Sequence, residues 1–419
     1  MNAMSDHAAV HPRARPLWEQ ARDIWWASNE TPDLGPVYSY HQQMERESHL
    51  DRFLLFLERE FHRIPRNPSE QQACQERIFS GFGHFAQEAL DWEERQVEAF
   101  RSKRFMDVGV HFARQARGFD SEISAQDIFQ AQRNVWTMNG LQAFFGQPVR
   151  LTPSVFAYSM LYPCSDNLLD DPVLSLQDKR EFNRRFRQKL EGDAVLPSDG
   201  RETSIFQLVD TIESEFPRTI FPLVWEGLLT IHRAQEESIQ LQRPRVSPYE
   251  VDVLGISFAK GGASVLADGY LVAKDVSPEQ AQFLYGLGCY MQLADDLQDV
   301  IDDRKAGILT VFSQTATRWP LDGITNRLLT FSARVTQGVI YFPQPDALPF
   351  QELLIGSLRL LVISAVGAAG RLYSREYLKD LERHSPFRFA ALHERKRRLA
   401  RLLPRALKML EAFASPAGA

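Results

Sequence analysis

The segment QAQFLYGLGCYMQLADDLQDVIDD, residues 280–303, carries the strongest structural signal in the chain. Its first half places apolar residues at steps of three and four, which is the period of a helix buried on one side. Its second half places carboxylates at the same period. Ser277, Pro278 and Gln280 occur in the order typical of a helix start, with Ser277 as the N-cap. The segment therefore predicts a long helix that ends in acidic residues.

The same helical period recurs along most of the chain. Examples are DRFLLFLEREFHRI (51–64) and DTIESEFPRTIFPLVWEGLLTIHRAQEESIQL (210–241). Pro and Gly clusters separate these segments, and no run alternates with the period of a strand. We therefore expect an all-α fold, a large single helical bundle over residues 41–419. Residues 1–40 are rich in Pro, His and Arg and predict a flexible N-terminal extension.

Composition limits the class of protein. Among 419 residues, 44% are hydrophobic and 24% are charged, which is typical of a globular chain, and the net charge of −6 does not favour a nucleic-acid partner. Three widely spaced cysteines indicate neither a disulfide framework nor a zinc site. The first residues lack the apolar region of a secretory signal, and the apolar stretch 353–370 contains Arg359 and several glycines, so we interpret it as a buried helix. We expect a soluble, cytoplasmic protein.

The acidic residues at the end of the opening segment form a stripe. Asp295, Asp299 and Asp303 are spaced by four residues, and Asp296 lies beside them. Such like-charged pairs cost a free helix roughly 0.2–0.5 kcal/mol each. No Lys or Arg occurs within residues 291–303 to compensate them. Hard cations are the natural counter-charge, and Mg²⁺ takes one or two carboxylates together with phosphate oxygens. The stripe therefore predicts a magnesium and phosphate site.

A second acidic cluster occurs earlier, in YPCSDNLLDDP (162–172). Asp166 and Asp170 are four residues apart, so on a helix they share one face. Either cluster alone is equally well explained as a solvated acidic helix face. Two such clusters, each following an apolar helical segment, favour a shared metal site.

These residues resemble those of a known family, the class I isoprenoid synthases. The stretch YGLGCYMQLADDLQDVIDD (285–303) is similar to the second aspartate-rich motif of the trans-prenyltransferases. The matching positions are Gln292, Asp295, Asp296 and Asp299. The same stretch is similar to the QLxxxLRDVxED element of squalene and phytoene synthases, in which Asp299 and Asp303 match. The first cluster is similar to the looser DxxxD form of the first motif and departs from DDxxD at Asn167.

Further matches lie between the two clusters. FAKGGASVLADG (258–269) is similar to the kinked, lysine-containing helix of the family and places Lys260 where the family binds diphosphate oxygens. Gly261 and Gly262 would allow the kink. Gln235 matches a glutamine that binds diphosphate, and Arg218 is a further candidate for that role.

The resemblance implies a function and a cofactor. It implies Mg²⁺, about three ions with substrate bound, on aspartates of both clusters. It also implies a terpene synthase-like enzyme that ionises a prenyl diphosphate, releases pyrophosphate and forms a terpene, with Asp166, Asp170, Asp295 and Asp299 as catalytic residues. The basic elements that bind a second diphosphate in chain-elongating members are missing, which disfavours elongation. Squalene- or phytoene-type coupling, elongation, and a catalytically silent subunit that binds prenyl diphosphate stay open.

The C-terminal segment ALHERKRRLARLLPRALKML (391–410) is basic and amphipathic. It suits a polar helix face that closes the bundle, and it also suits weak association with a membrane surface. Both interpretations stay open, and so does a homodimer.

Overall fold

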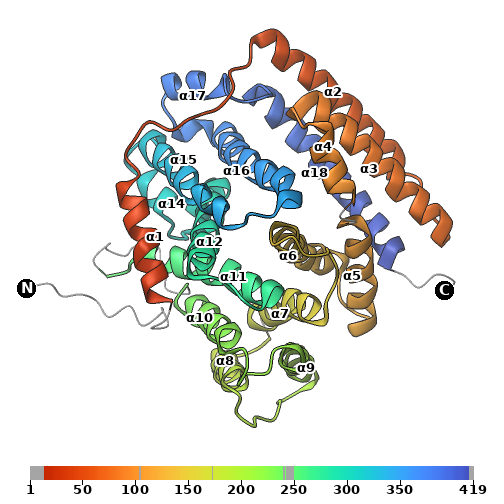
Figure 1. Ribbon diagram of the computed structural model, residues 1–419, viewed down its shortest axis with the longest axis vertical. Coiled ribbons are helices and arrows are strands. Elements are labelled where there is room, and N and C mark those ends of the chain that lie inside the picture. The colour runs from red at the N-terminus through yellow and green to blue at the C-terminus, as the bar shows by residue number, and fades with distance from the viewer. Residues whose placement is uncertain (1–13, 103–104, 172, 239–240, 242–249, 415–419) are drawn as a thin grey trace, which may run out of the picture. The chain divides into compact units, whose positions relative to one another are not determined.

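The computed structural model describes residues 14–102, 105–171, 173–238, 241 and 250–414 (Figure 1), without the side chains of Ser102, Tyr162, Asp166, Asp170 and Asp346. Over these residues every regular element is a helix and no strand occurs. The predicted all-α fold is therefore confirmed. The chain divides into two compact units, which are described one at a time.

The first unit comprises Met1–Val37, Pro217–Pro343 and Leu354–Ser385. Its central helix is α12, which packs against α11, α15 and α1, and α10 packs against α11 (Figure 1). The unit contains α1 (Arg15–Ala27), α10 (Pro222–Ser238), α11 (Val253–Ala273), α12 (Pro278–Gln298), α13 (Val300–Ala306), α14 (Val311–Thr315), α15 (Asp322–Thr336), η2 (Gln337–Tyr341), most of α16 (Leu348–Ala368), η4 (Gly370–Leu372) and α17 (Arg375–Glu382).

Glycines bring α11 and α12 into backbone contact. A Cβ atom added at Gly288 would lie 3.0 Å from the Cα of Gly262 and 2.8 Å from the carbonyl carbon of Gly261. A Cβ at Gly262 would lie 2.5 Å from the ring of Tyr285. The prediction that Gly261 and Gly262 permit a kink stays a prediction, since α11 is assigned as one helix over Val253–Ala273. The two glycines allow the helices to approach closely.

The start of α12 has the predicted cap. The Ser277 hydroxyl accepts a hydrogen bond from the Gln280 N–H, and the Gln280 side chain accepts one from the Ser277 N–H. Pro278 occupies the first turn, where its missing N–H costs nothing. The N-terminus of the helix was therefore predictable to the residue.

The segment expected to be a flexible extension contains α1, so that expectation needs correction for residues 15–37. Trp18, Ala21 and Trp25 are buried on one side of this helix. The Trp18 indole donates to the Gly255 carbonyl at 3.0 Å, and the Trp25 ring packs edge-on against Phe258. Burial of two indole rings, each worth a few kcal/mol, accounts for the ordering of this segment.

The second unit comprises Tyr38–Phe216, Gln344–Leu353 and Pro386–Ala419. In it α2 pairs with α3, α7 packs against α6 and α9, and α18 packs against α5 and α6 (Figure 1). Its elements are α2 (Tyr40–Glu60), α3 (Pro68–Leu90), α4 (Glu94–Ser102), α5 (Phe105–Phe119), α6 (Ala125–Phe144), α7 (Pro153–Asp170), α8 (Leu176–Glu191), α9 (Gly200–Glu215), η3 (Pro345–Ala347), the start of α16 and α18 (Phe389–Ala414).

Helix α16 corresponds to the apolar stretch interpreted as a buried helix. Among the described residues it alone is long and apolar enough to cross a membrane, and 39% of its most apolar window is buried. Val362, Ile363 and Val366 are buried, whereas Ile355 and Leu361 are exposed. The helix is therefore buried on one face only.

We predict that Gly288→Ala destabilises the protein by about 1–3 kcal/mol, because the added methyl group must push two helix backbones apart. Urea unfolding measures this loss. Gly323→Ala is the matched control, since it also lies in a helix of the first unit but has no atom within 4 Å of the added Cβ. The control should be neutral or gain up to about 0.5 kcal/mol, because Gly323 lies in the first turn of α15. Equal effects of the two substitutions would contradict the close-approach role.

Candidate active site

The acidic stripe lies where α12 ends and α13 begins. Asp299 follows Gln298, the last residue of α12, as the C-cap and leaves the helical conformation, with φ −94° and ψ 2°. The turn spacing nevertheless continues across this break. The Asp299 N–H donates to the Asp295 carbonyl at 3.0 Å, and the Asp303 N–H donates to the Asp299 carbonyl at 2.8 Å. The three carboxylates thus remain one turn apart, although the expected single helix is interrupted at Asp299.

Asp296 is the buried member of the cluster. The side chain is 7% exposed, and two groups hydrogen-bond to it: the Gln292 amide at 2.9 Å and the Ser257 hydroxyl at 3.2 Å. Burial raises the pKa of Asp296 from 3.8 to about 7, with a further rise from the nearby Asp295 carboxylate, against the opposing influence of these hydrogen bonds and of Lys260. This carboxyl therefore titrates near neutral pH.

The pKa of Asp303 is also raised by burial. Asp303 is half-buried, and its pKa is raised to about 6. Burial is the larger cause, and repulsion from Asp299, Asp295 and Asp302 adds to it. The C-terminal end of α12 adds the negative end of a helix dipole to this region. The region therefore has an excess of negative charge, which a bound cation would relieve.

Lysine and amide groups from α11 and α12 border the carboxylates. Lys260 lies close enough to Asp296 to oppose the rise in its pKa. Gln292 sits in the space that a side chain at Gly261 would occupy, since a Cβ there would lie 2.6 Å from the Cβ of Gln292. The structure thus brings together the predicted residues Lys260, Gln292, Asp295, Asp296, Asp299 and Asp303.

Sequence reasoning missed Ser257. It lies one helical turn before Lys260, on the same face of α11, and its hydroxyl donates to Asp296. The spacing Ser257–Lys260 was visible in the sequence, but a serine in an apolar helix gives no signal of its own.

The donor set has the chemistry of a magnesium site. All candidate ligands here are carboxylate oxygens, which Mg²⁺ prefers. Within the described part of the chain, no three His, Cys, Asp or Glu side chains converge into a ready-made metal cage. Mg²⁺ normally takes one or two protein carboxylates and completes its shell with water or phosphate oxygens. Asp295, Asp299 and Asp303 would therefore suit it as partial ligands.

Asp166 and Asp170 belong to the second unit, on the last turns of α7, and their side chains lie outside the described residues. Their predicted metal role stays a prediction. The neighbouring Asp171 is described: Arg201 donates to it at 2.7 Å and, with the Val173 N–H, holds its pKa below the usual value. Arg201 also lines a cavity of about 470 Å³ with Asp120 and Asp199.

Of the two remaining diphosphate candidates, Arg218 lies in the segment before α10 and Gln235 lies within α10. The Arg218 guanidinium stacks on the buried ring of Trp225, with 3.4 Å between its central carbon and the ring centroid. Gln235 is half-buried in the last turn of α10, and its carbonyl accepts from the Ser238 hydroxyl at 2.7 Å. The interactions described above do not join either residue to the aspartates, so their roles stay predictions.

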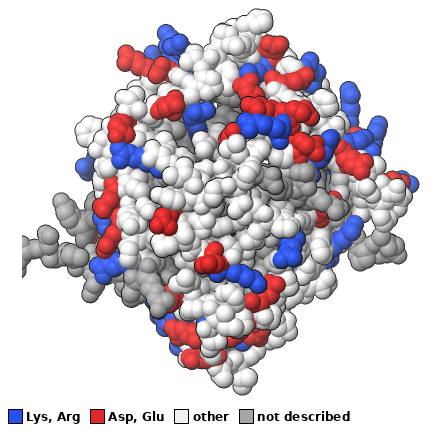
Figure 2. Space-filling model, viewed as in Figure 1, with Lys and Arg blue, Asp and Glu red and all other residues white. Residues whose placement is uncertain are grey.

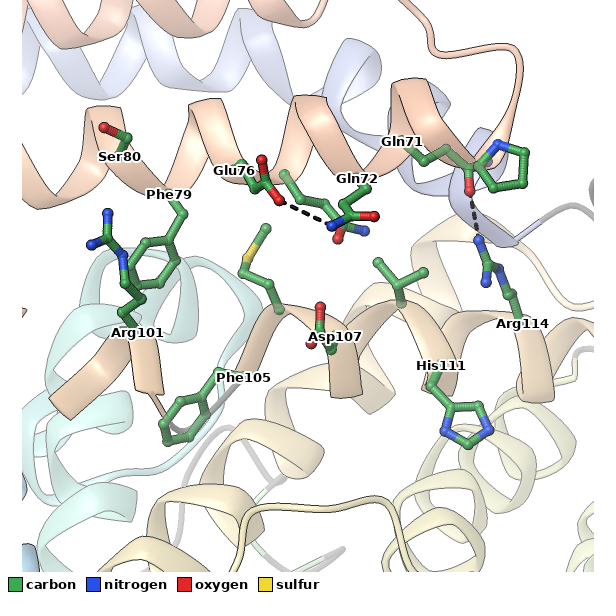
Figure 3. Close-up of a pocket in the computed structure, with 14 residues that line it drawn as sticks. Gln71, Gln72, Glu76, Phe79, Ser80, Arg101, Phe105, Asp107, His111 and Arg114 are labelled. Atoms are coloured by element: carbon green, nitrogen blue, oxygen red, sulfur yellow. Dashed lines mark hydrogen bonds between the residues drawn. The ribbon is translucent and has the colours of Figure 1, made fainter. Parts of the chain in front are cut away.

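A groove of about 920 Å³ lies in the second unit, between α3 and α5 (Figure 3). Gln72 and Glu76 point from α3 toward α5, and Asp107 points back from α5 (Figure 3). At one end Arg114 donates to the Gln71 side chain and to the Phe413 carbonyl. None of the residues predicted to bind metal or diphosphate lines this groove.

Comparison of the chain with protein-family models, with curated proteins and with solved structures finds no match. The likeness to isoprenoid synthases therefore rests on the residues quoted above.

The raised pKa of Asp296 predicts a pH-dependent stability. Its stabilising contribution is complete below about pH 4 and is lost as the pH rises through about 7, because the folded state retains a proton that the unfolded chain releases. Asp296→Asn removes the buried charge. In metal-free buffer the variant should exceed the wild type in free energy of unfolding at pH 8, by on the order of 2–4 kcal/mol. The difference should shrink toward pH 5, as measured by denaturant titration. A pH-independent difference would contradict this assignment.

Proposed function

We propose that the chain is a magnesium-dependent, class I terpene synthase-like enzyme that ionises a prenyl diphosphate. One observation carries the proposal: carboxylates spaced by one turn at the end of α12 border a lysine on the adjacent helix α11. This pairing suits a ligand that combines divalent cations with an anionic group. A diphosphate with bound Mg²⁺ has that composition.

Asp295 and Asp299 would be the principal metal ligands, with Asp303 and the first-cluster residues Asp166 and Asp170 as further candidates. Bound Mg²⁺ would supply positive charge to the diphosphate as it leaves. Asp296 is better suited to an indirect role, because its oxygens already accept hydrogen bonds from Gln292 and Ser257.

Lys260 would donate to diphosphate oxygens. An ammonium group held near the site of developing charge stabilises that charge most when it is already in place before the reaction. Helix α11, which is buried along nearly all its length, fixes the backbone of Lys260. Gln292 and Ser257 would hold the Asp296 carboxyl and so set the field around the ammonium.

The missing second basic site supports ionisation of a single substrate over elongation. Coupling of two prenyl groups remains the nearest alternative, since Asp299 and Asp303 also match the squalene and phytoene synthase element. The alternative from another class is a silent subunit that binds prenyl diphosphate without turnover.

Incubation with Mg²⁺ and prenyl diphosphates of several chain lengths tests the proposal. We expect pyrophosphate release and a terpene hydrocarbon or alcohol by gas chromatography. Release of pyrophosphate with formation of a doubled carbon skeleton would indicate coupling, and product only with added isopentenyl diphosphate would indicate elongation. Binding without release from any substrate would favour the silent subunit.

We predict that Asp295→Asn and Asp299→Asn each lower turnover by about 10²-fold or more, because each removes a carboxylate expected to hold the cation. Asp302→Asn is the matched control in the same acidic run. Its exposed carboxylate pairs with Lys305 at 2.8 Å, so its loss should change turnover little. Equal losses in all three variants would count against specific metal ligation.

A further inference from the structure

Helix α18 of the second unit is held in place by arginines at its start and on its inner side. Arg388, which directly precedes the helix, makes a two-pronged contact with Glu47 of α2 at 2.6 and 2.8 Å, and Arg398 contacts Glu58 at 2.7 and 3.0 Å. Arg395 pairs with Asp51 in the same way. Burial opposes ionisation of Glu47, but the hydrogen bonds from Arg388 outweigh it and keep the pKa of this carboxyl below its usual value. These cations already have partners within the protein.

The outer side of α18 differs from the inner side. It presents four exposed cations that form no ion pair among the described residues, namely Lys396, Arg397, Arg401 and Lys408. Two leucines one turn apart lie on the same side: Leu399 is 46% exposed and Leu403 is 39% exposed. At 100° per residue the leucines fall on one flank of the outer side, and Arg397, Arg401 and Lys408 fall on the other.

We propose that this outer side of α18 is a docking surface for an anionic lipid bilayer. Each cation near such a surface contributes about a five-fold gain in binding. Leu399 and Leu403 would insert among the acyl chains, while the long stems of Arg and Lys let their charged ends remain at the headgroups. The surface thus combines the cations and the exposed apolar side chains that an interfacial helix requires.

The combination of charge and exposed leucine favours lipid over nucleic acid. A phosphate backbone would use the cations but would gain nothing from two exposed leucines. The protein also carries a net charge of −6, and on the face seen in Figure 2 acidic and basic side chains are intermixed. The concentration of unpaired cations on one side of α18 contrasts with that background.

Vesicle sedimentation of the full chain tests the proposal. We expect the protein to pellet with vesicles of phosphatidylcholine and phosphatidylglycerol but not with phosphatidylcholine alone, and to dissociate as salt rises. The triple variant Arg397→Gln, Arg401→Gln, Lys408→Gln should bind about 100-fold more weakly. Leu399→Ser with Leu403→Ser should weaken binding at unchanged charge.

The control variant carries the same loss of charge elsewhere in the unit: Arg180→Gln, Arg184→Gln and Arg187→Gln on α8. It should bind vesicles like the wild type, and all variants should keep the wild-type melting temperature, because none of them touches the inner arginines. Pelleting that survives the triple substitution on α18, or that the α8 control abolishes, would overturn the assignment. So would binding of duplex DNA in place of vesicles, or a vesicle-independent dimer that the triple substitution dissociates.

Discussion

The first unit depends on one constraint, the contact between the backbones of α11 and α12 at Gly261, Gly262 and Gly288. Close-packed interiors do not leave room for an extra methyl group, and at Gly261 and Gly288 the opposing atoms include backbone, which cannot move aside as a side chain can. The same contact between α11 and α12 positions the polar groups of the candidate site. Gly261 directly follows Lys260, and its missing side chain leaves the space that Gln292 fills. The helix approach and the placement of the polar groups therefore have a single cause.

The carboxylate cluster is tolerated because it lies at the edge of this packed pair. Asp296 is buried but accepts two hydrogen bonds, and its raised pKa lets it take up a proton in place of an unpaired charge. Asp295 and Asp299 are exposed to water, which reduces their repulsion. The cluster thus combines one buried carboxyl, whose pKa is raised to about 7, with neighbours that are exposed to solvent.

Much of this arrangement was predictable from local pattern. The helical period gave the all-α fold, Ser277–Pro278–Gln280 gave the start of α12, and four-residue spacing gave the carboxylate stripe. Three features were not. The exit from helical geometry at Asp299 has no Pro or Gly to mark it in the sequence. The close approach at Gly261 and Gly262 involves Gly288, which lies on another helix. Helix α1 was overlooked, although Trp18, Ala21 and Trp25 follow the helical period, because the composition of the surrounding segment suggested an extension.

The two sets of charges differ in a way that bears on function. At the start and inner side of α18, Arg388 and Arg398 meet carboxylates with matched geometry, as stabilising ion pairs do. In the cluster at α12 and α13, carboxylates are gathered next to one another and burial raises the pKa of two of them, which lowers stability at neutral pH. Folding alone would favour replacing such residues with neutral ones. Their presence beside Lys260 agrees with the proposed function, in which the cations of a metal-bound diphosphate would offset the cost of assembling these carboxylates.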